Sequence, residues 1–384
     1  MAMTSSIEPH KKTGWRLRYL LTLGVASTAI LGACGSSGGS SSDTTAGSAT
    51  TAAAATTATG AAPTTGGATS AAPTTDGKPV SGSINLVAYS TPQAAYQDIE
   101  KAFKATDQGK DVTFSESYGA SGDQSRAVAA GQPADLVAFS LEPDITRLVK
   151  ANMVAADWNK NIYKGMVTKS VVVLAVRKGN PKHITGWDDL TKSGIQVITP
   201  NVFQSGGAKW NIMAAYGAQI AEGKTEVQAV DYLKALFKNV PVQDDSARKS
   251  LQTFTGGKGD VMIAYENDAI FAQQKGAAID YIVPPSTILI ENPDAVTSNA
   301  KNPDAAKAFL SFLYTPAAQE LFVKNGYRPV LPNIPGADKF PKPSGLFDIS
   351  KFGGWSTVNA KFFDPKKSIM QEVEASIGVS SSSS

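Results

Sequence analysis

Residues 35–80 contain no large apolar side chain before Val80, and this constrains the fold more than any other feature of the sequence. The segment consists almost entirely of Gly, Ser, Thr, Ala and Pro, so it cannot bury enough surface to offset the entropy cost of ordering. We therefore expect residues 34–80 to form a tether and residues 380–384 to form a disordered tail. Roughly 300 residues remain for folding, which is close to the size at which one hydrophobic core stops growing.

The leader, residues 1–33, has the parts of a secretory signal peptide: a basic segment, then an apolar run from Tyr19 to about Ile30. The run is shorter than the roughly 20 residues that span a bilayer. It ends in LGAC at 31–34, which resembles a bacterial lipobox, where the cysteine is lipidated after cleavage. We expect an exported lipoprotein anchored through Cys34, at the outer face of the cell membrane or in the periplasm.

Charge and cysteine content exclude several classes of protein. The formal net charge of +3 arises within residues 1–33, so the remainder is neutral and has no basic surplus for nucleic acid. Cys34 is the single cysteine and His183 the single histidine beyond the leader, which excludes an internal disulfide and a Cys/His metal site. We expect no metal, no cofactor and no enzymatic activity. A secreted hydrolase or a structural lipoprotein is the alternative from another class.

From Ile84 onward, short apolar runs alternate with helical patterns across Gly-containing turns. This alternation predicts α/β layers with a mostly parallel sheet. The runs at 171–176 and 282–290 predict two crossings between two lobes. We expect residues 81–172 and 286–379 to form lobe 1, with residues 173–285 inserted as lobe 2.

Three segments place a small or hydroxyl residue at the predicted start of a helix: 119–124, 205–210 and 245–248. The free N–H groups of a first helical turn, together with the helix dipole, attract anions. Each segment alone predicts only a helix cap, because Ser-Gly before a helix is a common N-cap.

Several motifs follow one another along the chain: SYGASGDQSRAV at 117–128, GQPADLV at 131–137, ITPN at 198–201 and SGGAKWN at 205–211. They resemble the prokaryotic sulfate-binding protein family. The first two are similar to its first anion loop, and the last two are the most specific match. Residues 176–182, 187–190, 259–267 and 327–329 extend the resemblance over about 83–332. It implies a type II periplasmic-binding-protein fold: two α/β lobes, two crossing segments and a ligand in the cleft. The implied partners are sulfate or a similar tetrahedral oxyanion and the permease of an ABC-type sulfate importer.

The resemblance also implies the residues that contact the anion, namely Ser121, Ser205, Gly206, Gly207, Ala247 through its backbone N–H, and Tyr265. Tyr265 stands where many members of the family have tryptophan, and Ser90 stands near where many have aspartate. Two interpretations stay open for Arg126, Lys209 and Arg248. They could strengthen anion binding through a positive electrostatic field from outside the lining of the site. Alternatively, they could be ordinary solvated helix residues that contribute nothing to binding.

A pocket that only donates hydrogen bonds suits sulfate, which is fully ionised at neutral pH, whereas hydrogen phosphate also needs an acceptor. Thiosulfate, molybdate, tungstate and phosphate stay open as alternative ligands. A buried carboxylate beside the anion would repel it. We therefore expect Asp123, Asp244, Asp245 and Glu266, which neighbour the predicted site, to face solvent or local lysines.

Overall fold

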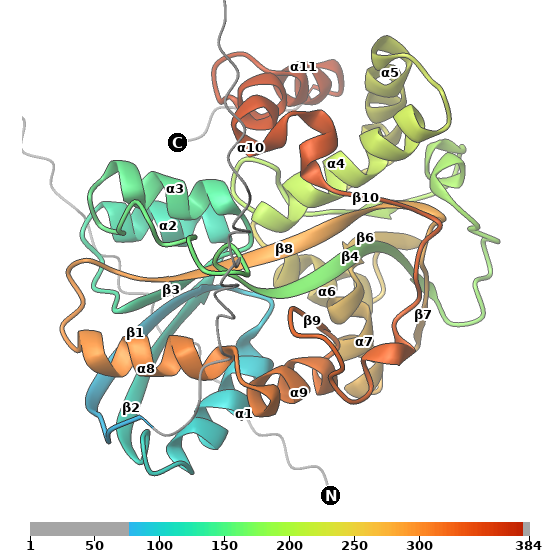
Figure 1. Ribbon diagram of the computed structural model, residues 1–384. Coiled ribbons are helices and arrows are strands. Elements are labelled where there is room, and N and C mark those ends of the chain that lie inside the picture. The colour runs from blue at the N-terminus through green and yellow to red at the C-terminus, as the bar shows by residue number, and fades with distance from the viewer. Residues whose placement is uncertain (1–76, 379–384) are drawn as a thin grey trace, which may run out of the picture. The chain divides into compact units, whose positions relative to one another are not determined.

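Two long strands, β4 (Met166–Arg177) and β8 (Ser286–Val296), run antiparallel through the centre of the fold and connect two groups of strands (Figure 1). The computed structural model describes residues 77–378, all within one unit of the chain, residues 67–384. The predicted leader, Cys34, most of the tether and the serine tail lie outside the described residues.

The first group of strands surrounds β1 (Ser81–Tyr89), which pairs in parallel with β2 (Asp111–Gly119) and β3 (Leu136–Ala138). Alternate residues of β1 point to opposite faces, so Ile84 and Leu86 enter one core and Val87 another. The first face is covered by α1 (Gln93–Lys104), α8 (Pro303–Leu313) and α9 (Pro316–Lys324), and the second by α2 (Ser121–Ala129) and α3 (Glu142–Lys150).

The second group of strands continues from the far half of β4. That half pairs antiparallel with β6 (Val261–Tyr265) and β7 (Ile279–Ile282), and β6 pairs in parallel with β5 (Val197–Ile198). Val172 and Leu174 face the core formed with α4 (Gly206–Ala221) and α5 (Glu226–Phe237). Val171 and Val173 face the core formed with α6 (Ala247–Thr255) and α7 (Glu266–Gln274).

The sheet is mixed, in the order β2-β1-β3-β8-β4-β6-β5, so the expectation of a mostly parallel sheet is wrong. The α/β class is confirmed. The difference arises because β4 carries the chain from one group to the other and β8 brings it back. The two strands consequently pair antiparallel with each other. β8 also pairs antiparallel with β3, and β4 pairs antiparallel with β6 and β7.

After α9 the chain returns to the second group. β9 (Arg328–Pro329) pairs with β4, and β10 (Gly345–Phe347) pairs in parallel with β8. The remaining elements are 3-10 turns η1 (Trp187–Thr191), η2 (Ala337–Lys339) and η3 (Ile349–Phe352), α10 (Gly354–Val358), the π-helix η4 (Asn359–Phe363) and α11 (Ile369–Ser376). Trp355 of α10 lies edge-on to Trp210 of α4, with ring centroids 4.6 Å apart. Residues expected in lobe 1 therefore pack against helices expected in lobe 2.

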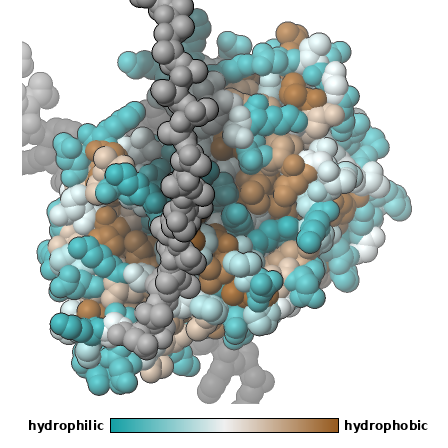
Figure 2. Space-filling model, in the orientation of Figure 1, coloured by the Kyte–Doolittle hydropathy of each residue, from teal (hydrophilic) through white to brown (hydrophobic). Residues whose placement is uncertain are grey.

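Side chains at the surface are mixed in character. On the face seen in Figure 2, apolar patches are interleaved with polar side chains. The described helices include none that is both long enough and apolar enough to cross a bilayer.

Candidate functional site

A small cavity lies where the ends of two strands meet the starts of three helices. It contains about 200 Å³ of space between its lining atoms, part of which is open to solvent. The lining residues are Tyr89, Ser90 and Thr91 after β1, Ala120 and Ser121 at α2, Ser205, Gly206 and Gly207 at α4, Ala247 at α6, and Tyr265 at the end of β6. All six predicted contact residues are therefore brought together in one cavity. Tyr89, Thr91 and Ala120 were not predicted to lie there.

Local sequence explains why two of the three helices start at the cavity. Ser205 and Ser246 are N-caps, and their hydroxyls accept from the N–H groups of Ala208 and Lys249, at 3.4 Å in both cases. Helix α2 starts after Ala120, in an extended conformation and without a side-chain cap. The N–H groups of a first turn have no partner within their own helix, so each start supplies donors. The Ser205 hydroxyl can also donate its own proton.

Gly206 lets α4 approach the chain that follows β3. A Cβ atom added at Gly206 would lie 2.6 Å from Ser140 Oγ and 3.0 Å from Leu141 Cγ, too close for any side chain without movement. Glycine at this position is therefore a packing requirement as well as a means of exposing a donor.

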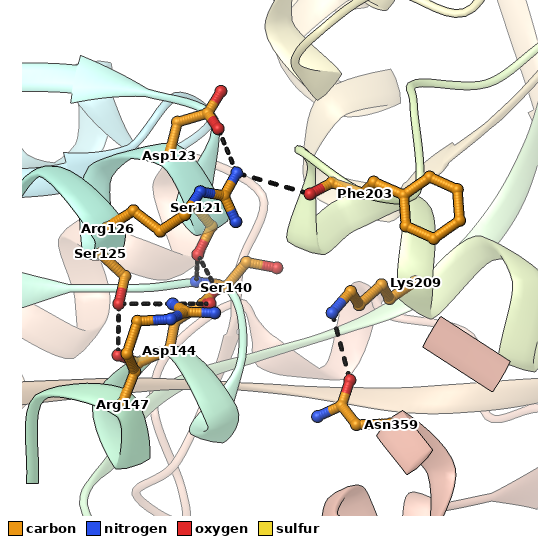
Figure 3. Close-up of polar contacts among 10 residues, drawn as sticks. All are labelled: Ser121, Asp123, Ser125, Arg126, Ser140, Asp144, Arg147, Phe203, Lys209 and Asn359. Atoms are coloured by element: carbon orange, nitrogen blue, oxygen red, sulfur yellow. Dashed lines mark hydrogen bonds and ion pairs between the residues drawn. The ribbon is translucent and has the colours of Figure 1, made fainter. Parts of the chain in front are cut away.

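Ser121 is held by a buried network (Figure 3). Its hydroxyl donates to Asp144 Oδ2 at 2.7 Å and accepts from the N–H of Ser140 at 3.0 Å. Arg147 Nη1 holds the other Asp144 oxygen at 2.8 Å and donates to Ser125 Oγ at 2.7 Å. The hydroxyl proton of Ser121 is thus engaged, so the donor that Ser121 has left for a ligand is its backbone N–H.

Tyr265 is held in position by a hydrogen bond to Ser140, with 2.7 Å between Tyr265 Oη and Ser140 Oγ. The Ser140 carbonyl accepts from Trp210 Nε1 at 2.9 Å and from Asn292 Nδ2 at 3.1 Å. Burial raises the pKa of Tyr265, so the phenol stays protonated and can donate. Ser140, which sequence reasoning missed, is the residue through which Tyr265, Trp210 and Ser121 are connected.

Charged side chains lie outside this lining: among the described residues that line the cavity, none is Asp, Glu, Lys or Arg. Arg126 pairs with Asp123 and donates to the Phe203 carbonyl at 3.5 Å. Lys209 donates to Asn359 Oδ1 at 3.1 Å, and burial lowers its pKa to about 8.

Arg248 is closer to the cavity, since it donates to the carbonyl of the lining residue Thr91 at 2.6 Å. The positive groups are therefore held near the cavity but not in its wall.

The acidic residues follow the expectation in part. Asp123 pairs with Arg126 and Asp245 with Lys249, at positions partly exposed to solvent. Asp244 instead accepts from the hydroxyls of Ser250, at 3.1 Å, and Thr253, at 3.0 Å.

For Glu266 the expectation of solvent or a local lysine is wrong. Its side chain is fully buried, and Arg328, 62 residues further on, holds both carboxylate oxygens, with Nε to Oε2 2.7 Å and Nη2 to Oε1 3.1 Å. The reason is that β6 runs directly into α7, which places the first turn of α7 inside the protein.

The arrangement places hydrogen-bond donors from three helix starts around one small cavity. Residues 77–378 contain no group of three or more His, Cys, Asp or Glu that could hold a metal ion. A small cavity at helix starts, beside two strands that cross between α/β layers, is the arrangement of a type II periplasmic binding protein.

Comparison with known proteins identifies the family. The chain belongs to the bacterial extracellular solute-binding proteins, whose family model matches residues 84–328. It is therefore an extracytoplasmic solute-binding protein and not an enzyme. A sulfate-binding protein from Synechococcus elongatus is 41% identical over 92% of this chain and 95% of its own length.

Two further comparisons cover most of the folded region. The solved structure of the sulfate-binding protein SubI from Mycobacterium tuberculosis is 46% identical, covers 73% of this chain and 99% of its own, and gives a TM-score of 0.72. A thiosulfate-binding protein from Pseudomonas aeruginosa is 32% identical over 72% of this chain and 88% of its own length. The predicted resemblance to sulfate-binding proteins and the predicted fold are thereby confirmed.

Proposed function

We propose that this protein captures sulfate outside the cytoplasm and delivers it to an ABC-type importer. The observation that carries the proposal is the cavity itself, which is small and lined by uncharged residues from three helix starts and two strand ends. Sulfate is a compact dianion without a proton, so it needs donors on every side and no acceptor. The relatives named as sulfate-binding proteins support the same ligand.

In this proposal the donors come from opposite walls of the cavity. Backbone N–H groups of Ser121, Gly206, Gly207 and Ala247 hold the anion, together with the hydroxyls of Ser205 and Tyr265. Hydrogen bonds to a charged group contribute about 1.5–3 kcal/mol each, and helix starts supply part of the compensating charge. Arg126, Lys209 and Arg248 act from outside the cavity wall.

The proposed mechanism of capture is closure of two lobes on the anion. We assign residues 81–172 and 286–344 to the first lobe and residues 173–285 to the second, and we add residues 345–376 to the second because they pack on α4 and α5. Besides the contacts of Tyr265 and Trp210 with Ser140 and of Arg248 with Thr91, two further contacts join the proposed lobes beside the cavity. The N–H of Gly122 donates to the Gln204 carbonyl at 3.1 Å, and Arg126 donates to the Phe203 carbonyl.

The location of the protein at the membrane is also part of the proposal. A lipid on Cys34, followed by the tether, would hold the binding unit near the permease while leaving it free to move. The cysteine lies outside the described residues, so the support is the LGAC motif at the end of an apolar run.

A calorimetric titration of the chain without its first 34 residues tests the ligand. Sulfate, thiosulfate, molybdate, tungstate and phosphate are titrated in turn at fixed ionic strength. We expect tight sulfate binding and no phosphate binding. Tighter binding of phosphate than of sulfate would refute the donor-only cavity, and tighter binding of thiosulfate, molybdate or tungstate would reassign the ligand.

Ala247→Pro tests the site independently of the ligand's identity. Ala247 is the first residue of α6, where proline is well accepted, and Ser246 before it is extended, as a residue before proline should be. The variant keeps the helix but removes the donor N–H, so we expect about 10- to 150-fold weaker sulfate binding.

Glu226→Pro is the matched control, because Glu226 opens α5 after an extended Thr225 and does not line the cavity. Equal affinity in the two proline variants would show that the N–H of Ala247 is not a contact.

A further inference from the structure

A cluster of buried polar groups begins at the cavity lining, extends behind it and takes no part in the donor set. It consists of Tyr89 and Thr91, which line the cavity, and of Arg248, Asp268 and Tyr327. These residues come from the end of β1, the turn after it, α6, α7 and the turn before β9. Within the described part of the chain, both carboxylate oxygens of Asp268 and one side-chain polar atom of each other member are buried without a well-formed hydrogen bond. The Thr91 hydroxyl still lies close enough to Asp268, and the Tyr89 phenol close enough to Tyr327, to lower the pKa of each. Buried polar groups are normally satisfied, so this concentration beside a binding site calls for an explanation.

Asp268 lies beside Thr91, a residue of the cavity lining. Its side chain is fully buried on α7, and the Thr91 hydroxyl, whose residue lines the cavity, lies near enough to lower the pKa of the carboxyl. The cationic group that faces Asp268 is Arg248.

Arg248 directly follows Ala247 in the first turn of α6. Its guanidinium donates to the Thr91 carbonyl and lies 4.1 Å from the centre of the Phe271 ring, and its backbone N–H donates to Ser90 Oγ at 3.4 Å. A dianion in the cavity and the carboxylate of Asp268 would therefore share one positive charge.

We propose that Asp268 sets the affinity of the anion site: its negative charge opposes a bound dianion, and loss of that charge, by protonation or substitution, tightens binding. This inference rests on the proposed sulfate-binding function. Two like charges in a poorly solvated region disfavour each other, so the dianion favours the neutral carboxyl. By reciprocity, a protonated Asp268 favours the dianion to the same extent. The proton comes from solvent.

The structure gives the pH range in which this coupling operates. Burial raises the pKa of Asp268 to about 6, against the lowering effects of Arg248 and Thr91. The other ionisable groups facing Asp268 are the phenols of Tyr327 and Tyr265, with Tyr89 beyond them, and burial raises the pKa of each phenol. Between pH 5 and pH 7.5 Asp268 is thus the group in this cluster that titrates, and sulfate itself stays a dianion.

The expected effect is a gain in affinity on acidification. If the anion raises the pKa of Asp268 by about one unit, sulfate affinity increases about tenfold as the pH falls from 7.5 to 5. In Asp268→Asn the affinity should be independent of pH in this range and close to the value of the unmodified protein at pH 5. The side chain keeps its shape and the cluster loses one negative charge.

Sulfate titration calorimetry at pH 5, 6 and 7.5 tests the proposal, with Glu100→Gln as the control. Glu100 is also a buried carboxyl with a raised pKa, but it lies between α1 and β2, away from the cavity, so its removal should leave the pH profile of sulfate affinity intact. Titration of the unmodified protein in buffers of different ionisation enthalpy should also show proton uptake on sulfate binding at pH 6. This measurement does not depend on whether the variant folds.

The outcomes separate the possibilities. A purely structural Asp268 would make Asp268→Asn bind sulfate more weakly than the unmodified protein at pH 7.5, and this result would overturn the proposal. A flat pH profile without proton uptake in the unmodified protein would overturn it as well. If the unmodified protein bound no sulfate at any pH, the proposed function itself would fail.

Discussion

Gly206 gives a direct test of how closely the walls of the cavity must approach. An alanine Cβ at this position would lie 2.6 Å from Ser140 Oγ and 2.7 Å from Ser140 Cβ, distances that real Cβ contacts essentially never show. Ser140 cannot easily yield, because its hydroxyl holds Tyr265, its N–H holds Ser121 and its carbonyl accepts from Trp210. Gly206→Ala should therefore displace donors on both walls of the cavity.

The size of the effect follows from the cost of overpacking. Inserting a methyl group into a closely packed site costs typically about 1–3 kcal/mol. If that cost falls on the ligand-bound conformation, sulfate affinity decreases about 5- to 150-fold. Alanine also favours a helix over glycine by up to about 1 kcal/mol, so the thermal midpoint without ligand should change little.

Calorimetry with sulfate and thermal unfolding without sulfate together check this prediction. Gly186→Ala is the matched control, because a Cβ added at Gly186 meets no atom within 4 Å. Unchanged sulfate affinity in Gly206→Ala would show that α4 does not contribute a closely packed wall to the site and would refute the reasoning.

Two further predictions concern buried carboxyl groups. Arg328→Ala leaves the fully buried Glu266 carboxylate without its partner, so we expect the free energy of unfolding, measured with denaturant, to fall by about 3–5 kcal/mol. Arg126→Ala is the control, because it removes an exposed ion pair and should lower the free energy of unfolding by less than about 1 kcal/mol. Equal losses would contradict this. Burial and the neighbouring Glu116 raise the pKa of Glu100 from 4.5 to about 8, so its contribution to stability is complete below about pH 4.5 and is lost as the pH rises to about 8. Between pH 5 and pH 9 the thermal midpoint of Glu100→Gln should therefore fall less steeply with rising pH than that of the unmodified protein. The same slope in both proteins would show that Glu100 does not cause the loss of stability.

Local chemistry made much of the secondary structure predictable. The alternation of apolar runs and helical patterns expected from Ile84 onward is present, for example at β6 (Val261–Tyr265), because a continuous apolar run is typical of a buried strand. Likewise, Ser205 and Ser246 cap the helices that sequence reasoning placed after them, because a serine side chain can accept from the first turn of the helix that follows it.

Long-range contacts account for what sequence reasoning missed. The direction of β8 against β4 depends on pairing between residues more than 100 positions apart, and no local pattern encodes it. Glu266 was misjudged for the same reason, since Arg328 is far along the chain. Ser140 carries no recognisable motif, and its importance arises because three elements bond to one residue.

The sequence by itself thus determined the α/β class, the starts of the helices and, through resemblance, six of the ten residues that line the cavity. These features depend on neighbours in the chain or on motifs that can be recognised one at a time. Only the tertiary structure decided that the helix starts meet in a single cavity, that Ser121 spends its hydroxyl on Asp144, and that Asp268 lies buried behind the wall. The physical reason is that strand pairing and core packing bring distant segments together. The resulting arrangement determines which charges and hydrogen-bond partners surround each side chain.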